Sequence, residues 1–201
     1  TPNPGVDMAQ RPRPRLDESA LTIRDCARRS ELTASRSQIV DGVGPIDADL
    51  LFVGEAPGEE EDRVGEPFVG RSGDLLDEVL ADQGLSRSAV RITNAVKCRP
   101  PENRDPTATE RANCRPYLDR EIAAVDPAAI VTLGKVPSEE LLDRSVAVTR
   151  EAGETETVSI EGTAYRVLIG LHPAATMYDP STREPFEAVI EAAAAIAAGE
   201  R

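Results

Sequence analysis

The chain has 201 residues, of which 40% are hydrophobic, and it carries a formal net charge of −13 at pH 7. That length is sufficient for one α/β domain with a well-buried core. The sequence has no apolar run of membrane-spanning length and begins without the basic and then apolar pattern of a signal peptide, so we expect a cytoplasmic protein. Its three cysteines fit no disulfide framework, and its single histidine argues against a histidine-rich metal site.

The N-terminal segment, residues 1–15, is rich in proline and arginine and has no hydrophobic period. This composition favours a flexible tail. We therefore expect the folded domain to occupy residues 16–201. A helix is predicted over residues 16–34, with Asp17 near its start.

Four short apolar runs follow, at residues 49–53, 90–93, 129–133 and 166–171. Each is rich in β-branched or other apolar residues and is bounded by turn residues, which is typical of a buried strand.

Helical patterns lie between the runs, at residues 73–81, 107–125, 137–142 and 185–198. Strands that alternate with helices indicate a mostly parallel sheet with helices on both faces, which is a three-layer α/β/α domain. The polar segment 143–162 is expected to form a loop or an additional hairpin.

Residues suited to ligand binding or catalysis follow the predicted strands. The sequence GEAPG at 54–58 follows the first strand, and Asn94 and the segment 97–101 follow the second. Gly134 follows the third strand and His172 the fourth. In open parallel sheets, ligands bind beyond the carboxyl ends of the strands. The sequence therefore predicts one site along this edge of the sheet.

Each of these features has two interpretations, one functional and one structural. The 54–58 turn exposes N–H groups that can hold a carbonyl or a phosphate, or it is an ordinary connection between a strand and a helix. The acidic run 59–62 is a solvated loop, or one of its carboxylates orients a water or stabilises a cationic sugar. Phe68 is a stacking platform or a loop anchor. Asn94 and His172 are hydrogen-bonding groups of a site, or polar residues that satisfy the nearby backbone.

Taken together, four segments closely resemble the family-four uracil-DNA glycosylases, the iron–sulfur branch of that superfamily. The matching segments are GEAPGEEED at 54–62, GEPFVGRSG at 65–73, ITNAVKCRPP at 92–101 and LHPA at 171–174. Each is a weak signal alone, and their combination is specific. The resemblance runs from about Cys26 to the end of the chain.

The resemblance implies a three-layer α/β/α sandwich with a four-stranded parallel sheet, and a substrate uracil flipped out of single- or double-stranded DNA into a snug pocket. Carried over by position, Gly54, Glu55 and Ala56 line that pocket and Phe68 stacks on the base. Asn94 reads the edge of uracil and so rejects cytosine, whose exocyclic amine would leave two donors facing each other.

The resemblance also implies that His172 stabilises the negative charge that develops on uracil O2 as the base leaves. The glycosidic bond breaks through a sugar cation, and water adds at C1′. Glu55 or Glu61 orients that water, and the sequence does not choose between them.

A 4Fe–4S cluster is implied as well, on four cysteines. Cys26, Cys98 and Cys114 match three of them, and the fourth position is Arg29, which cannot be a thiolate ligand. Three alternatives stay open: a cluster with a ligand such as Asp25 or water, a three-iron cluster, or no cluster.

Contacts with DNA phosphates are expected, from position alone, at Arg71, Lys97, Ser138 and Arg183. The acidic composition, with lysine only at 97 and 135, is typical of proteins adapted to high salt, such as those of haloarchaea. Strong salt screens the repulsion between an acidic enzyme and DNA. We expect a monomer without a nucleotide cofactor.

Two other functions compete with an active glycosylase. A catalytically degenerate relative would bind uracil-containing DNA without cutting it. A nucleotide or phosphate-ester enzyme would use the glycine-rich turn, but the chain has neither the Gly-Lys-Ser/Thr sequence of a P-loop nor the spacing of a dinucleotide fingerprint.

Overall fold

A computed structural model describes residues 21–27 and 30–199 of the chain. The segment expected to be a tail, residues 1–15, and the position of Arg29 lie outside the described residues. The domain boundary at residue 16 stays a prediction for the same reason.

The centre of the fold is a five-stranded sheet with the strand order β2-β1-β3-β5-β4. Its strands are β1 (Leu50–Gly54), β2 (Arg91–Asn94), β3 (Ala129–Leu133), β4 (Thr155–Ile160) and β5 (Thr163–Gly170). The four apolar runs found in the sequence form β1, β2, β3 and β5, which are parallel to one another.

The expected total of four strands is wrong, because the polar segment supplies an edge strand. β4 pairs antiparallel with β5, so segment 143–162 contains the hairpin strand that was one of its two predicted structures. Exposed and partly buried residues alternate along β4. Such alternation suits an edge strand with one solvent-facing side, whereas the continuous burial of β1 and β3 suits the sheet interior.

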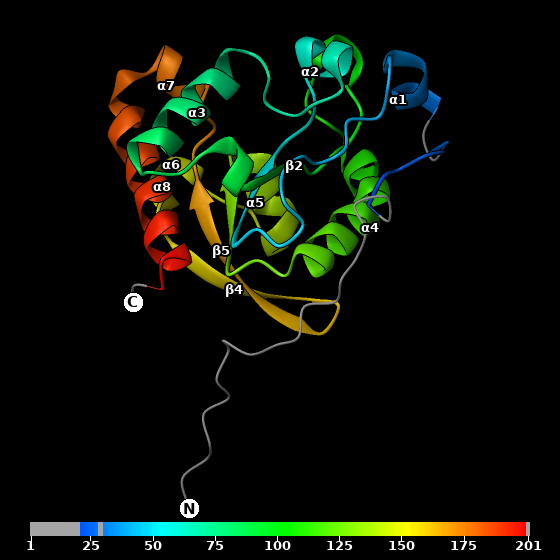
Figure 1. Cartoon of the computed structure of the whole chain (residues 1–201). Helices are drawn as coiled ribbons and strands as arrows, with labels where there is room; N and C mark the ends of the chain where they lie inside the picture. Colours follow the sequence, from blue (N-terminus) through cyan, green and yellow to red (C-terminus); the bar gives the residue numbers. More distant parts are fainter. Residues whose placement is uncertain (1–20, 28–29, 200–201) are drawn as a thin grey trace, which may run out of the picture.

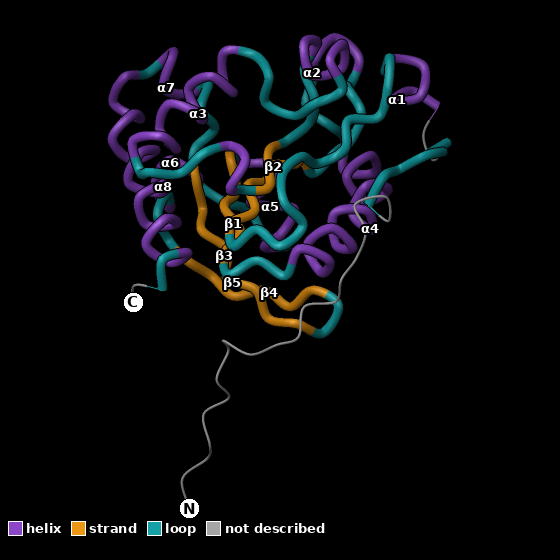
Figure 2. Tube along the Cα trace, viewed as in Figure 1, coloured by secondary structure: helices purple, strands orange, loops and turns teal. Residues whose placement is uncertain are grey.

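Helices cover both faces of the sheet, as predicted (Figures 1 and 2). The described helices are α1 (Ser30–Ser35), α2 (Glu59–Val64), α3 (Arg71–Asp82), α4 (Ala108–Val125), α5 (Lys135–Leu142), α6 (Val148–Glu151), α7 (Ala175–Tyr178) and α8 (Arg183–Ala197). Short 3-10 turns of the described residues lie at Arg87–Ala89, Pro101–Asn103 and Pro180–Thr182. The predictions at 73–81, 107–125, 137–142 and 185–198 match α3, α4, α5 and α8.

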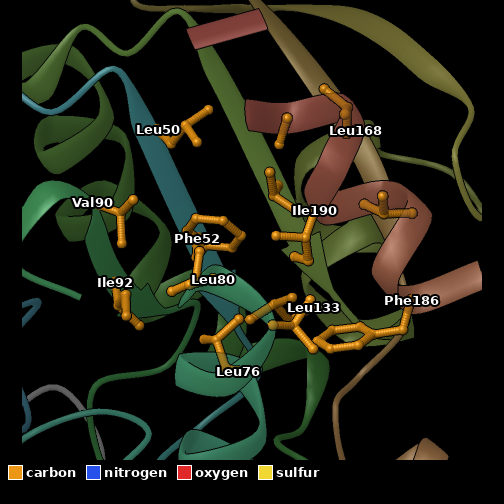
Figure 3. Close-up of a cluster of buried hydrophobic side chains, with 14 of the residues drawn as sticks. Leu50, Phe52, Leu76, Leu80, Val90, Ile92, Leu133, Leu168, Phe186 and Ile190 are labelled. Atoms are coloured by element: carbon orange, nitrogen blue, oxygen red, sulfur yellow. The ribbon is translucent and has the colours of Figure 1, made fainter. Parts of the chain in front are cut away.

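Successive residues of β1 point alternately into the two halves of the core, one on each face of the sheet. Phe52 points into an apolar cluster with Leu76 of α3 and Ile190 of α8, which Figure 3 shows. Leu51 points to the opposite face, where it packs with Leu118 of α4. Successive side chains of this central strand point to opposite faces of the sheet and pack against helices on both sides. This packing produces the α/β/α layers.

The helix predicted over residues 16–34 is wrong for residues 21–27, which have no helical structure. Leu21 and Ile23 alternate with exposed neighbours and are each 8% exposed, which is a period of two rather than 3.6. The N–H of Ile23 donates to the carboxylate of Asp41 instead of to a helical carbonyl. Among the described residues of the predicted segment, helix is found only from residue 30 onward, in α1.

Among residues 21–27 and 30–199, no helix combines the length and apolar character needed to cross a bilayer.

Candidate active site

Two neighbouring strands of the sheet end side by side at the candidate site. Gly54 closes β1 and lies in register with Asn94, which closes β2. Beyond these ends is a pocket of about 220 Å³. Its lining residues are Glu55, Ala56, Pro57, Gly58, Glu61, Phe68, Ser72, Asn94, Pro100, Asn103, Arg104 and His172.

The structure brings together almost all of the residues that the sequence assigned to a base pocket. Gly54 is not itself a lining residue, but it lies against two that are, Phe68 and Asn94. A Cβ atom at Gly54 would lie 2.4 Å from Oδ1 of Asn94 and 2.6 Å from the ring of Phe68. Only glycine therefore lets the aromatic ring and the amide approach the end of β1 this closely.

The ring of Phe68 forms one wall of the pocket and also belongs to the core cluster. Its backbone has a positive φ of 54°, which is uncommon for a bulky residue. Gly73, in the first turn of α3, makes room for this conformation, because a Cβ there would lie 1.8 Å from the carbonyl oxygen of Phe68. The helix start thus holds the backbone of the loop that carries the ring.

His172 lines the pocket two residues after the end of β5. Its ring centroid is 5.8 Å from that of Phe68, and the two ring planes are tilted by 31°. Nδ1 accepts a hydrogen bond from the N–H of Ala174 at 3.1 Å, so the neutral ring carries its proton on Nε2. Burial lowers the pKa of His172 to about 4, which keeps the imidazole neutral at physiological pH.

Glu55 and Glu61 are the two carboxylates of the pocket. Burial, with a smaller contribution from the neighbouring Asp105, raises the pKa of Glu55 to about 7, while Arg111 acts in the opposite direction. Glu61 lies at the opposite side of the turn, close to Gly58, where a Cβ would be 2.8 Å from its carboxylate oxygen. Both carboxylates border the pocket, so the geometry supports either one in orienting a water.

The acidic run that contains Glu61 is helix α2 rather than a loop, and its members have different environments. Asp62 is 2% exposed and accepts hydrogen bonds from the backbone N–H groups of Ser37 and Gln38. Glu60 pairs with Arg63 at the surface. Composition could not separate the structural carboxylate from the one that faces the pocket.

One wall of the pocket was not predicted. Pro100, Asn103 and Arg104 line it from the loop after Cys98. Glu102 and Asn103 both have a φ of 55°, so the chain turns back sharply toward the pocket. Asparagine tolerates this left-handed conformation, which is the only local signal for the turn.

Arg104 fixes that wall to the fourth helix. Its guanidinium binds the carboxylate of Glu110 at 2.7 and 2.8 Å. Hydrogen bonds from Arg104 and from the backbone of Thr107 lower the pKa of Glu110 to about 2. Thr107 and Glu110 also form the capping box of α4, so the pocket wall and the helix start share one network.

Two of the four expected phosphate contacts do not suit the positions of their side chains. Lys97 is 2% exposed, and its Nζ donates to Glu121 at 2.7 Å. Ser138 is fully buried, and its hydroxyl bonds the carbonyl of Gly134. Arg71 is exposed at the start of α3. Arg183 is about one-third exposed and pairs with two glutamates of α3 and α8.

Lys97 instead belongs to a buried network behind the pocket. The carboxylate of Glu121 accepts from Arg91 at 2.7 Å, from Thr93 at 2.9 Å and from Lys97 at 2.7 Å. Arg91 and Thr93 are the strand residues that precede Asn94. The network therefore joins α4 to the strand that positions the amide in the pocket.

The three cysteines converge next to this site. Cys26, Cys98 and Cys114 line a small cavity of about 10 Å³ together with Leu32 and Arg36. Burial raises the pKa of both the Cys98 and the Cys114 thiols. The sequence prediction that these residues gather is supported, since all three face the same cavity.

The residues around the cavity do not fit a four-ligand iron–sulfur cluster. Arg36 points its guanidinium at the thiols, with Nη1 at 3.1 Å from Sγ of Cys98. Glu110 also lines the cavity, but its carboxylate is bound by Arg104. In the part of the chain that the structure describes, no three His, Cys, Asp or Glu side chains are arranged to hold a metal ion, so Asp25 does not complete a set.

The chain is similar in sequence to known uracil-DNA glycosylases, in agreement with the residues that line the pocket. The family model of the uracil DNA glycosylase superfamily matches residues 42–194. A type-4 uracil-DNA glycosylase of Archaeoglobus fulgidus is 42% identical over 176 residues, which cover 86% of this chain and 88% of the relative. A type-4 enzyme of Saccharolobus solfataricus is 41% identical over 86% of this chain and 82% of its own length.

A type-5 uracil-DNA glycosylase of Pyrobaculum aerophilum is more distant, with 31% identity over 84% of this chain and 88% of its own length. The resemblance to type-4 enzymes stated from the motifs therefore extends over most of the sequence. The match to the family model includes β1 to β5, the pocket wall at Phe68 and the segment that carries His172. The chain belongs to the uracil DNA glycosylase superfamily.

Proposed function

We propose that this protein hydrolyses the N-glycosidic bond of deoxyuridine in DNA, releasing uracil and leaving an abasic site for repair. The observation that carries the proposal is the convergence of Phe68, Asn94 and His172 on one pocket at the ends of β1, β2 and β5. Each residue alone has a structural explanation. Together they supply a stacking surface, an amide and a neutral imidazole around a cavity of base-sized dimensions.

Recognition of the base rests on Phe68 and Asn94. The ring of Phe68 stacks on the flipped base, a contact worth roughly 1–3 kcal/mol for aromatic residues on bases. The amide of Asn94 donates to uracil O4 and accepts from N3–H. Cytosine presents a donor in place of O4 and an acceptor in place of N3–H, so it opposes the amide in both positions.

Bond cleavage rests on His172. As the bond between C1′ and N1 breaks, its electron pair moves to the base, and negative charge develops on O2. The Nε2–H of neutral His172 donates to that oxygen, because the N–H of Ala174 occupies Nδ1. A preorganised donor of this kind contributes about 10²–10³-fold to rate.

Completion of the reaction needs a water molecule. The sugar cation at C1′ accepts the water oxygen, and one proton passes to a carboxylate. Glu55 and Glu61 both line the pocket and can take this role. Glu55 is the better acceptor near neutral pH, because burial raises its pKa to about 7 and an acceptor works best when its pKa is near the working pH.

The surroundings of the pocket suggest how the DNA strand is held. Arg71 is exposed at the start of α3, so it is available to a backbone phosphate, and Arg183 can become so if it leaves its glutamate partners. The protein has a net charge of −13 and is therefore repelled by DNA, which is also negatively charged. Salt screens this repulsion. We infer that the protein is a cytoplasmic monomer adapted to high salt.

The experiment that tests the proposal uses an oligonucleotide with one uracil, in single-stranded and duplex form, at low and high salt. Alkali then cuts any abasic strand. We expect cleavage at the uracil position and none in a matched oligonucleotide with thymine. Tight binding without cleavage at any salt concentration would instead favour the catalytically degenerate relative.

A further inference from the structure

The three cysteines of this chain surround a cavity that a protein side chain already enters. Arg36 follows α1, and its Nη2 donates to the carbonyl oxygen of Cys26 at 2.7 Å. Its Nη1 lies 3.1 Å from Sγ of Cys98. One guanidinium therefore links the segment of Cys26 to the loop of Cys98.

Further contacts join the same segments. The hydroxyl of Ser35 donates to the carbonyl of Arg99 at 2.8 Å, which ties the end of α1 to the Cys98 loop. Leu32 packs in one apolar cluster with Val96, Cys98 and Cys114. Backbone and apolar contacts thus hold α1, the loop and α4 together.

The small size of the cavity is a second argument against a bound cluster. The cavity of about 10 Å³ has room for one water molecule, which needs roughly 10–15 Å³. A core of four irons and four sulfides is far larger, and each iron needs a thiolate or an equivalent ligand. The chain supplies three thiols, and its fourth matching position is an arginine in the sequence.

We infer that this protein has a metal-free pocket at the place where the family resemblance implies a four-cysteine cluster site, and that the guanidinium of Arg36 joins the thiol-bearing segments there. Arg36 is then a structural residue of the region next to the base pocket. The cysteines are small buried side chains that complete its packing.

The first test measures iron and acid-labile sulfide in the full-length protein, purified without oxygen and then exposed to iron and sulfide under reducing conditions. We expect no stoichiometric iron and no absorbance band near 400 nm. The same treatment of Arg29→Cys, which restores a fourth cysteine, is expected to give both. The inference is overturned if wild type takes up as much iron as Arg29→Cys. It is also overturned if Arg29→Cys stays free of iron, because the missing thiol would not then be the barrier.

The second test examines Arg36 itself. Arg36→Met keeps most of the side-chain stem and removes the guanidinium. We expect a lower Tm and faster alkylation of Cys98 than in wild type. Arg63→Met is the matched control, because Arg63 is a surface arginine whose guanidinium pairs with Glu60 at 2.7 Å, away from the cysteines. Equal Tm and equal alkylation rates in wild type, Arg36→Met and Arg63→Met would refute the role of Arg36. Both tests are independent of uracil release.

Discussion

The backbone N–H of Ala174 donates a hydrogen bond to Nδ1 of His172 at 3.1 Å. This bond leaves the proton of the neutral ring on Nε2, so the imidazole enters the pocket as a donor. Because burial lowers the pKa of His172 to about 4, the ring stays neutral over the range in which the protein is expected to work. The proposed catalytic role depends on this pair of residues.

The first prediction concerns His172. We expect His172→Ala to lower the single-turnover rate of uracil release by about 10²–10³-fold, since a preorganised donor to the departing base is lost. His172→Gln retains an N–H donor and is expected to keep part of the rate. Circular dichroism controls for folding, because the ring also lies against Phe68. An equal, small effect of both variants would remove His172 from the bond-breaking step.

The second prediction concerns pH. Burial raises the pKa of Glu55 to about 7, so its carboxyl is protonated below that pH and ionised above it. A proton acceptor must be ionised, and kcat/KM should therefore rise with pH and level off above about 7. His172, with a pKa of about 4, adds no second inflection between pH 5 and 8.

Glu55→Gln separates the two carboxylates. If Glu55 accepts the proton, this variant loses both rate and the rise with pH, whereas Glu61→Gln keeps the rise. The opposite pattern, with the rise intact in Glu55→Gln, would assign the water to Glu61.

The third prediction concerns the choice of base. Asn94→Asp replaces the amide donor with a second acceptor, which can face the exocyclic amine of cytosine. We expect slower release of uracil and measurable release of cytosine from DNA that wild type leaves intact. The ratio of kcat/KM for the two bases is the measurement. An unchanged ratio would mean that Asn94 supports the strand end and does not read the base.

The fourth prediction concerns the loop of Phe68. Alanine favours helices over glycine by about 1 kcal/mol, but a methyl group at Gly73 would meet the carbonyl of Phe68 at 1.8 Å. Gly73→Ala is expected to displace the ring and raise KM for uracil-containing DNA. In a Phe68→Ala background, the same substitution should add little.

Gly84→Ala is the matched control for Gly73→Ala. Gly84 lies just after the same helix at a φ of 70°, and a Cβ there meets nothing within 4 Å. Alanine in this conformation costs about 1–2 kcal/mol of stability and should leave KM unchanged. If Gly73→Ala behaves like Gly84→Ala, the helix start does not position Phe68.

The fifth prediction contrasts two basic residues. Lys97→Met removes one partner from the buried carboxylate of Glu121, so we expect a loss of roughly 3 kcal/mol of unfolding free energy. Arg71→Ala should leave stability unchanged and reduce the slope of log Kd against log salt by about one. Urea unfolding and titrations at several salt concentrations measure the two effects. If Lys97→Met also reduced the salt slope, Lys97 would be a DNA-contacting residue and the account of its burial would be wrong.

The sequence predicted the parallel part of the fold well, because β1, β3 and the end of β5 are short apolar runs bounded by turn residues, and β2 lies in a similar segment that begins at Val90. It did not establish β4, whose side chains alternate and are mostly polar. This strand is stabilised by its pairing with β5 and by the packing of Val158 and Ile160 in the core. The segment 21–27 was assigned to a helix as part of the range 16–34, with Asp17 near the expected start, and the structure shows no helix there. The backbone N–H of Ile23 donates to Asp41, which is 18 residues away in sequence, and local helical periodicity cannot reveal such a partner.

The candidate site was predicted in part, for a similar reason. Gly54 and Asn94 end parallel strands and His172 closely follows another, so the parallel arrangement brings them to one edge of the sheet. Asn103 and Arg104 enter the pocket only because two successive residues adopt a positive φ. The burial of Lys97 could not be anticipated either, since its partner Glu121 lies in the middle of a helix with charged residues on several sides.

Mass spectrometry of products tests the central claim most directly. Uracil-containing DNA is incubated with wild type or with His172→Ala, at matched protein concentration and high salt, and free base and strand mass are measured in the same sample. We predict equal amounts of free uracil and abasic strand with wild type, and a release rate at least about a hundred-fold lower with His172→Ala. Intact DNA with wild type, or equal release by both proteins, would contradict the account.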